Sequence, residues 1–194
     1  MTAFVLGNGI SRRPIDVDKL LTLGPVYGCN ALYRTHTPTV LVATDRLIGA
    51  AIQKSGYAAS NRFYTRRPEK ESGAIDIPKP YFGFSSGPVA VALAAMDNNS
   101  PIYLLGFDLG PTEQGRFNNV YADSEFYKKG DSTPTFTGNW IKQIITIANN
   151  FSTQKFIRVH GSTTADVSEF DSVPNLEKMD FAKFVARINN TKDL

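Results

Sequence analysis

Short apolar runs alternate along the chain with segments that have helical periodicity. The apolar runs are rich in β-branched or aromatic residues and are bounded by glycine, asparagine or aspartate, which is typical of buried strands. They occupy residues 3–6, 25–30, 39–44, 102–105 and 155–160. The helical segments between them cover residues 16–23, 46–54, 86–96 and 138–149. This alternation predicts an α/β domain with a mostly parallel sheet.

Four other segments have a different pattern. Residues 61–66 alternate polar and aromatic side chains and predict an edge strand, and residues 67–80 are charged and proline-rich and predict an exposed loop. Residues 108–134 are polar and aperiodic, as in a long insertion. In residues 176–188 the apolar positions share one helical face, which predicts a C-terminal helix. We expect residues 161–194 to be an extension whose helix docks on the domain or joins two copies in a homo-oligomer.

The composition limits what the chain can be. Of its 194 residues, 42% are hydrophobic and 20% are charged, which excludes a disordered chain and supplies the core of one domain. No apolar run approaches the ~18 residues of a membrane span. The single cysteine, Cys29, excludes an internal disulfide, and two histidines leave little for a histidine-based metal site. We therefore expect a cytoplasmic protein, and its net charge of +3 permits an anionic partner.

A glycine turn directly follows the first predicted strand. Gly7, Asn8, Gly9 and Ser11 lie in this turn, and glycine lets a backbone approach a ligand closely. Free N–H groups in such a turn can hold a phosphate. Because Arg12 stands where a dinucleotide fingerprint has its third glycine, an ordinary NAD site is disfavoured. A tight turn without a ligand is the alternative.

The helix predicted at residues 86–96 begins in a segment rich in serine and glycine. Ser85, Ser86 and Gly87 would present free N–H groups there, and the positive end of the helix dipole favours an anion such as phosphate. A simple N-cap role for Ser86 explains the same residues without a ligand.

Three polar residues, Asn30, Asp45 and Asp108, lie at the ends of other predicted strands. Ligands of open parallel sheets bind outside the carboxyl ends of the strands, so we expect these side chains and the two turns on one rim. Two carboxylates and an amide there could hold Mg²⁺ or ribose hydroxyls. Taken singly, each residue has an ordinary alternative role as a helix cap or a turn residue.

Four motifs carry a resemblance to known families. They are residues 6–11 (LGNGIS), residues 27–33 (YGCNALY), Ser86-Gly87 at the start of an alanine-rich helix, and residues 102–108 (IYLLGFD). Their order is similar to that in small bacterial sialyltransferases that use CMP-sialic acid. It also resembles a broader Rossmann-like group that includes 6-hydroxymethyl-dihydropterin diphosphokinases of the archaeal type. The resemblance spans roughly residues 3–159 and implies a single Rossmann-like nucleotide-binding domain over residues 1–160.

The resemblance also implies roles for individual residues. In the sialyltransferases the glycine-asparagine-glycine turn and the later asparagine contact the cytidine nucleotide. Carried over, this implies that Asn8, Gly9 and Asn30 contact a nucleotide, with Ser86 and Gly87 beside the donor.

Two positions depart from the sialyltransferase pattern. The catalytic histidine of that family precedes the helix that here begins near Gly138, and this chain has Thr-Phe-Thr at residues 135–137 instead. Thr44 and Asp45 replace the asparagine that follows the third strand of that family, as in the diphosphokinase-like relatives.

Two further features are candidates for chemistry or binding. His160 ends a predicted strand and is a candidate base for activating an acceptor hydroxyl. Asp108 is a second catalytic candidate. The alternative for His160 is a structural role at the end of its strand.

Residues 61–67 interleave arginines with Phe63 and Tyr64, a pattern compatible with binding of nucleic acid. An edge strand protected by charge explains the same pattern better.

The insertion at residues 108–134 leaves the strand that should border the nucleotide. We expect it to form a lid or an acceptor pocket, with Tyr121 and Tyr127 as contacts and Lys128 near phosphate. An ordered arm that packs on a neighbouring subunit is the alternative.

Together these residues predict a nucleotide-dependent transferase. The leading hypothesis is transfer of a sugar from a nucleotide sugar to an acceptor hydroxyl. A second hypothesis is Mg²⁺-dependent diphosphate transfer from ATP, with Asp45 and Asp108 as metal-linked carboxylates. A third is a non-catalytic nucleotide-binding or scaffold protein, because a fold alone does not establish activity.

Overall fold

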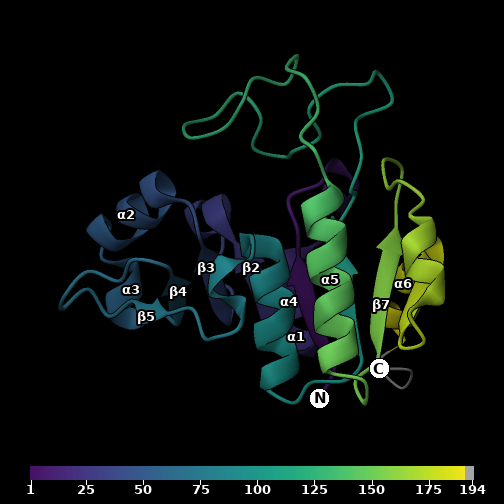
Figure 1. The fold of residues 1–194 in the computed structure, drawn as a ribbon, viewed down its shortest axis with the longest axis horizontal. Coiled ribbons are helices and arrows are strands. Elements are labelled where there is room, and N and C mark those ends of the chain that lie inside the picture. Colours follow the sequence, from purple (N-terminus) through teal and green to yellow (C-terminus); the bar gives the residue numbers. More distant parts are fainter. Residues whose placement is uncertain (191–194) are drawn as a thin grey trace.

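The computed structural model describes residues 1–190, which contain one sheet of eight strands that all run parallel (Figure 1). The central strands are continuous apolar runs because both faces of the sheet are covered. The strands are β1 (Ala3–Leu6), β2 (Val26–Cys29), β3 (Val40–Ala43), β4 (Phe63–Thr65), β5 (Ile75–Asp76), β6 (Ile102–Leu105), β7 (Phe156–His160) and β8 (Leu176–Asp180). The Rossmann-like α/β prediction is confirmed.

The strand order places a switch point in the middle of the sheet. The order is β5-β4-β3-β2-β1-β6-β7-β8, so the chain builds outward from β1 to β5 and then returns to the other side of β1. Connections at such a point leave in opposite directions, which opens a crevice at the carboxyl ends of the two strands. The glycine turn after β1 and Asp108 after β6 both lie at this crevice.

Helices cover both faces of the sheet, which gives three layers (Figure 1). α4 and α5 share one hydrophobic cluster with the sheet, and α1, α2 and α6 share the other. The α-helices are α1 (Val17–Leu23), α2 (Arg46–Lys54), α3 (Tyr57–Ser60), α4 (Ser86–Met96), α5 (Gly138–Asn150) and α6 (Phe181–Asn189). Short 3₁₀ segments are η1 (Ile10–Arg12), η2 (Asn30–Arg34), η3 (Tyr81–Gly83) and η4 (Ser168–Ser172). Within residues 1–190, no helix combines the length and the apolar character that a membrane crossing requires.

α4 is apolar on all sides and forms the centre of one layer. Nine of its eleven residues are buried, because it lies between the strands of the sheet and α5. Its small alanine side chains permit this close packing. The buried helix therefore holds its N-terminus in a fixed position at the carboxyl edge of the sheet.

The predicted edge strand at residues 61–66 is wrong in its position. β4 does form there, but β5 pairs with it, so β4 is the second strand from the edge and Phe63 is fully buried. β5 has only two residues and lies inside the proline-rich segment expected to be a loop. A strand that short shows no alternation in the sequence, so its pairing is decided by the tertiary structure.

The predicted helix at residues 176–188 is wrong in its first five residues. These residues form β8, which pairs in parallel with β7, and the helix begins only after Asp180. The prediction failed because Leu176 and Met179 are three residues apart, which fits a helix as well as a short strand. The expected extension at 161–194 therefore continues the same sheet, and its last four residues lie outside the described ones.

α6 docks on its own chain through its apolar face. The side chain of Phe184 is fully buried, and its ring lies 6.3 Å from the ring of Phe4 and 5.3 Å from the ring of Tyr103. Ile188 lies one turn further along the same face and is also buried. Of the two roles expected for this helix, the docked one is confirmed for these residues.

We expect Phe184→Ala to lower the free energy of unfolding by about 3–5 kcal/mol, because it removes a buried aromatic ring and leaves a cavity. Urea unfolding followed by circular dichroism measures this change. Lys183→Ala, at an exposed position of the same helix, is the matched control and should change stability by less than about 0.5 kcal/mol. Equal stability of the two variants would contradict the docking of α6.

Candidate active site

A cavity of about 270 Å³ lies at the carboxyl edge of the sheet. The ends of β1, β2, β3 and β6 meet there with the start of α4, under the insertion between β6 and α5 (Figure 1). The cavity brings together seven of the predicted nucleotide-binding residues and both predicted metal-linked carboxylates. They are Gly7, Asn8, Gly9, Asn30, Ser85, Ser86, Gly87, Asp45 and Asp108. Ser11 does not line the cavity and lies behind the turn, against Asp108.

The glycines of the turn after β1 are required by close packing. A Cβ on Gly7 would lie 2.5 Å from the carbonyl oxygen of Gly106, and a Cβ on Gly9 would collide with the carboxyl group of Asp108. The turn's N–H groups also have partners: Gly7 donates to Leu105 O at 2.8 Å and Gly9 to Gly106 O at 2.8 Å. These two glycine N–H groups therefore bind the protein itself and are not the free phosphate donors that the sequence suggested.

The hydroxyl of Ser86 joins the ends of two strands, β2 and β3, to α4. It accepts a hydrogen bond from Thr44 N at 2.9 Å, lies 2.9 Å from Thr44 Oγ1 and donates to Asn30 Oδ1 at 3.1 Å. Since its single proton goes to Asn30, Thr44 Oγ1 must donate to it. Asn30 lies at the cavity in a left-handed conformation with φ of 53°, and its Nδ2 group has no hydrogen-bond partner among the described residues. The N-cap of α4 is Ser85 and not Ser86, one residue earlier than expected.

The N-terminus of α4 supplies free hydrogen-bond donors to the cavity. Val89 is the first residue of α4 whose backbone N–H makes a helical hydrogen bond, to Ser85 O at 2.9 Å. Pro88 has no N–H group, so the orphan donors at the cavity are the amides of Ser86 and Gly87. No lysine, arginine or histidine of the described residues lines the cavity. The attraction that this cavity offers to an anion therefore comes from backbone amides and the helix dipole, and not from basic side chains.

The two carboxylates at the cavity differ in their environment. Asp108 is buried, and its oxygens accept hydrogen bonds from Ser11 N at 3.0 Å and from the hydroxyls of Ser11, Thr163 and Thr164. Asp45 is exposed and, although it is the N-cap residue of α2, its side chain makes no capping hydrogen bond. Asp45 therefore has free oxygens for a ligand, whereas the oxygens of Asp108 are already used to hold the fold.

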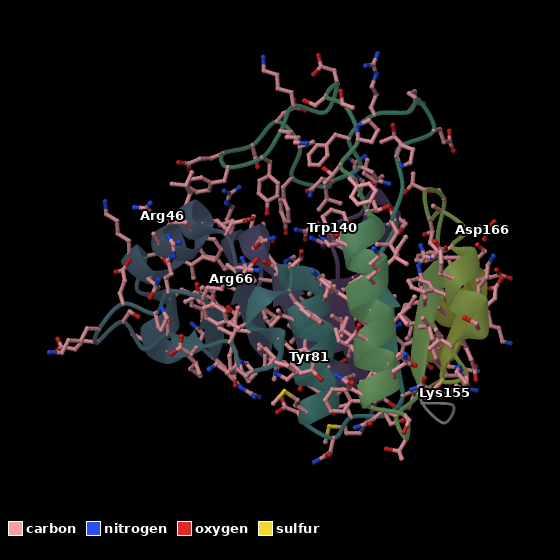
Figure 2. All side chains as sticks on the ribbon, viewed as in Figure 1. Arg46, Arg66, Tyr81, Trp140, Lys155 and Asp166 are labelled. Atoms are coloured by element: carbon pink, nitrogen blue, oxygen red, sulfur yellow. The ribbon has the colours of Figure 1, made fainter. Side chains whose placement is uncertain are left out.

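Several residues that sequence reasoning missed also line the cavity. Phe107, Phe117 and Trp140 form apolar walls of the cavity. Trp140 lies in the first turn of α5, beneath the insertion (Figure 2). Asn118 donates nothing from its buried Nδ2 atom, while its Oδ1 accepts from Ile10 N at 2.8 Å. In the sequence, neither the single tryptophan nor the Asn118-Asn119 pair directly follows a predicted strand, so no local pattern placed them at the carboxyl edge of the sheet. Only the fold of the insertion brings them there.

The insertion is fastened to the domain, and the three residues predicted to contact a ligand have partners within the protein instead. Tyr121 accepts a hydrogen bond from Arg12 at 2.8 Å, and Tyr127 accepts one from Ala31 N at 3.3 Å. The ammonium of Lys128 lies 5.8 Å from the ring centre of Phe117. Tyr121, Tyr127 and Lys128 thus do not line the cavity.

Neither the imidazole of His160 nor the thiol of Cys29 is available as a reactive group in this cavity. His160 lines a separate hollow, and burial together with Arg158 and Lys178 lowers its pKa to about 4. Cys29 borders the cavity, but burial raises the pKa of its thiol to about 12, so it is protonated at neutral pH.

The arginines of residues 61–67 mostly have partners within the protein. Arg62 pairs with Asp97 at 2.7 Å and lies over the ring of Tyr64. Arg66 donates to the carbonyl oxygens of Phe82 at 2.7 Å and Phe84 at 2.6 Å and so supports the segment that leads into α4. Within residues 1–190, no group of three or more acidic, histidine or cysteine side chains could hold a metal ion.

We expect Gly9→Ala to lower the free energy of unfolding by about 1–3 kcal/mol, because the added methyl group would collide with the Asp108 carboxyl group. Gly83→Ala is the matched control, since a Cβ there meets nothing within 4 Å. Thermal unfolding of both variants measures the difference. A stability of Gly9→Ala equal to that of the control would show that the turn does not require close approach.

Comparison with known proteins adds no assignment to this geometry. The resemblance to sialyltransferases and diphosphokinases thus stays a prediction carried by the four motifs. No protein-family model, no curated protein and no solved structure matches the chain.

Proposed function

We propose that the cavity binds a nucleotide-activated donor and that the protein transfers a sugar from it to an acceptor hydroxyl. The observation that carries the proposal is the pair of free α4 amides, Ser86 N and Gly87 N, at a cavity on the switch point of the sheet. Helix N-termini in this position bind phosphate through free N–H groups and the helix dipole.

The charge of the cavity favours a donor with one phosphate. No basic side chain of the described residues lines it, and Asp45 adds a negative charge. The helix dipole is equivalent to about half a positive charge, which offsets about half the charge of a single phosphodiester and a much smaller share of the charge of a triphosphate. We therefore infer a donor in which the sugar is joined to a nucleoside monophosphate.

The remaining walls suit a nucleoside and a sugar. Phe107, Phe117 and Trp140 offer apolar surfaces against which a base or a sugar ring can pack. The Nδ2 group of Asn30 has no hydrogen-bond partner among the described residues, so it fits a hydroxyl or carbonyl oxygen of the ligand.

Asp45 is the group in the cavity that fits the role of general base. In the transfer, the acceptor oxygen forms a bond to the anomeric carbon, and its proton passes to the Asp45 carboxylate. The bond between the anomeric carbon and the phosphate oxygen breaks, and the nucleoside monophosphate leaves with the electron pair. The α4 amides stabilise the charge that develops on the departing phosphate. In this scheme Asp108 is a positioning residue, because its oxygens are held by internal donors.

The alternative that a specific observation favours is Mg²⁺-dependent diphosphate transfer. The free carboxylate of Asp45 beside a phosphate-binding helix N-terminus is a possible metal-linked ligand. In that case Mg²⁺ would supply the positive charge that the cavity lacks and would permit a nucleoside triphosphate to bind. The two hypotheses therefore differ in their response to metal and in the effect of Asp45.

Isothermal titration of the protein with nucleoside monophosphates, diphosphates and triphosphates tests the donor site. Because no basic side chain of residues 1–190 lines the cavity, we expect monophosphate to bind more tightly than triphosphate and to bind equally in Mg²⁺ and in EDTA. The four common bases provide the comparison series. Tighter binding of triphosphate that is lost in EDTA would favour diphosphate transfer, and no binding of any nucleotide would remove the proposal.

Asp45→Asn separates binding from catalysis. Removing a like charge near the phosphate should tighten monophosphate binding by about fivefold, which corresponds to about 1 kcal/mol. The same variant should lose turnover of a nucleotide sugar, because the general base is gone. Asp76→Asn, an exposed carboxylate on β5, is the control and should change neither quantity. Loss of both binding and turnover in Asp45→Asn would indicate the metal-dependent alternative, and unchanged turnover would remove Asp45 as the base.

A further inference from the structure

A second hollow of about 260 Å³ lies beside the last two strands of the sheet, between one face of β7 and β8 and the segment that contains η4. It shares no lining residue with the candidate active site. Arg158 and His160 on β7 and Lys178 on β8 supply its basic groups, and Val167, Phe170 and Leu176 supply apolar wall. It therefore combines cationic and apolar surfaces.

The guanidinium of Arg158 is a buried charge without a carboxylate partner. The residue is 2% exposed, and no carboxylate of the described residues lies within 4.0 Å of it. It donates to the carbonyl oxygens of Phe107 at 3.0 Å and Asp108 at 3.1 Å, and its centre lies 5.4 Å from the ring of Phe170. A further guanidinium nitrogen lies 3.4 Å from His160 Nε2. The carboxylates of Asp108 and Asp166 act on the guanidinium from a distance, without a direct ion pair, and its burial lowers the pKa of Arg158 to about 10.

A carboxylate of the protein already lies at the mouth of this hollow. Asp166 Oδ1 accepts a hydrogen bond from Lys178 Nζ at 2.6 Å and lies 4.0 Å from His160 Nδ1. Its side chain is 86% exposed, and it lies on the outside of the molecule at the end of the β7 region opposite Lys155 (Figure 2). An exposed ion pair of this kind contributes little, so an external anion can replace Asp166.

The rim limits the charge of such an anion. Glu177 and Asp171 also line the hollow, and Glu177 pairs with Lys155 at 2.8 Å. These carboxylates would repel a dianion such as phosphate more than a monoanion. The apolar wall in turn requires a ligand with an apolar body.

We propose that this hollow is a binding site for a small organic monocarboxylic acid with an apolar body, which displaces Asp166 from Lys178 and His160. The ligand carboxylate would lie in the field of Arg158, and its apolar body would pack against Phe170 and the neighbouring apolar wall. This site is separate from the proposed transferase site and does not depend on it.

His160 provides the readout for binding. Its imidazole faces Arg158 on its own strand, Lys178 and Asp180 on β8, and Asp166 on the following loop, and its pKa is lowered to about 4 by burial and the two cations. In the proposed complex a carboxylate held inside the hollow replaces the carboxylate of Asp166, which is 86% exposed and 4.0 Å from His160 Nδ1. A less solvated carboxylate favours the imidazolium form more strongly, so the pKa of His160 should rise on binding. The other histidine, His36, is half-buried in a loop outside this hollow and serves as an internal reference.

The experiment follows both histidines by NMR while the full chain is titrated with phenylacetate, acetate, benzyl alcohol or phosphate. We expect phenylacetate to shift the His160 resonances and raise its pKa with little change at His36. Acetate should bind more weakly because it lacks the apolar body, phosphate should bind more weakly because of the rim, and benzyl alcohol should cause no shift in pKa. An equal response to the acid and the alcohol, or tighter binding of phosphate, would overturn the proposal.

Two exposed substitutions test the displacement of Asp166. Asp166→Asn removes the competing carboxylate and should tighten phenylacetate binding by about two- to fivefold. Lys178→Gln should weaken binding by a similar factor. Lys183→Gln carries the same change of charge on α6, which covers the opposite face of the sheet, and should leave the affinity unchanged. An affinity that is the same in Asp166→Asn and in the unmodified protein would show that the acid does not bind here.

Discussion

The buried carboxylate of Asp108 is the interaction on which the arrangement of the candidate site depends. It follows the central strand β6 and accepts hydrogen bonds from the turn after β1 and from the loop after β7, so it ties together three connections at the switch point. The approach of that turn is close enough that Gly9 has no room for a side chain. A buried carboxylate is stable only when such donors satisfy it, so these connections are fixed together.

The second constraint is the complete burial of α4. An apolar helix between the sheet and α5 cannot move without exposing its core residues, so its N-terminal amides have a fixed position. The Ser86 hydroxyl then aligns Asn30 and Thr44 on the ends of the neighbouring strands. Fixed dipoles of this kind interact with an anion without reorganising, which is the physical basis for the proposed phosphate site.

The two hollows differ in how they present positive charge. The candidate active site has backbone amides and no basic side chain among the described residues, whereas the second hollow has Arg158, His160 and Lys178. One residue links them, because Arg158 lines the second hollow and donates to the carbonyl oxygens of Phe107 and Asp108 in the first. The same guanidinium therefore supports the floor of one site and supplies the charge of the other.

The sequence by itself determined the central strands, the longer helices and the rim of strand ends, since continuous apolar runs and helical periodicity are local properties. It thereby predicted the cavity residues of the glycine turn, Asn30, Asp45 and the Ser-Gly helix start. Only the tertiary structure decided the pairing of β5 and β8, because strands of two to five residues carry no clear period. The tertiary structure also decided that donors within the protein occupy the oxygens of Asp108 and that Trp140 and Asn118 line the cavity. It placed His160 in the second hollow. Those outcomes depend on contacts between residues far apart in the chain, which no local pattern contains.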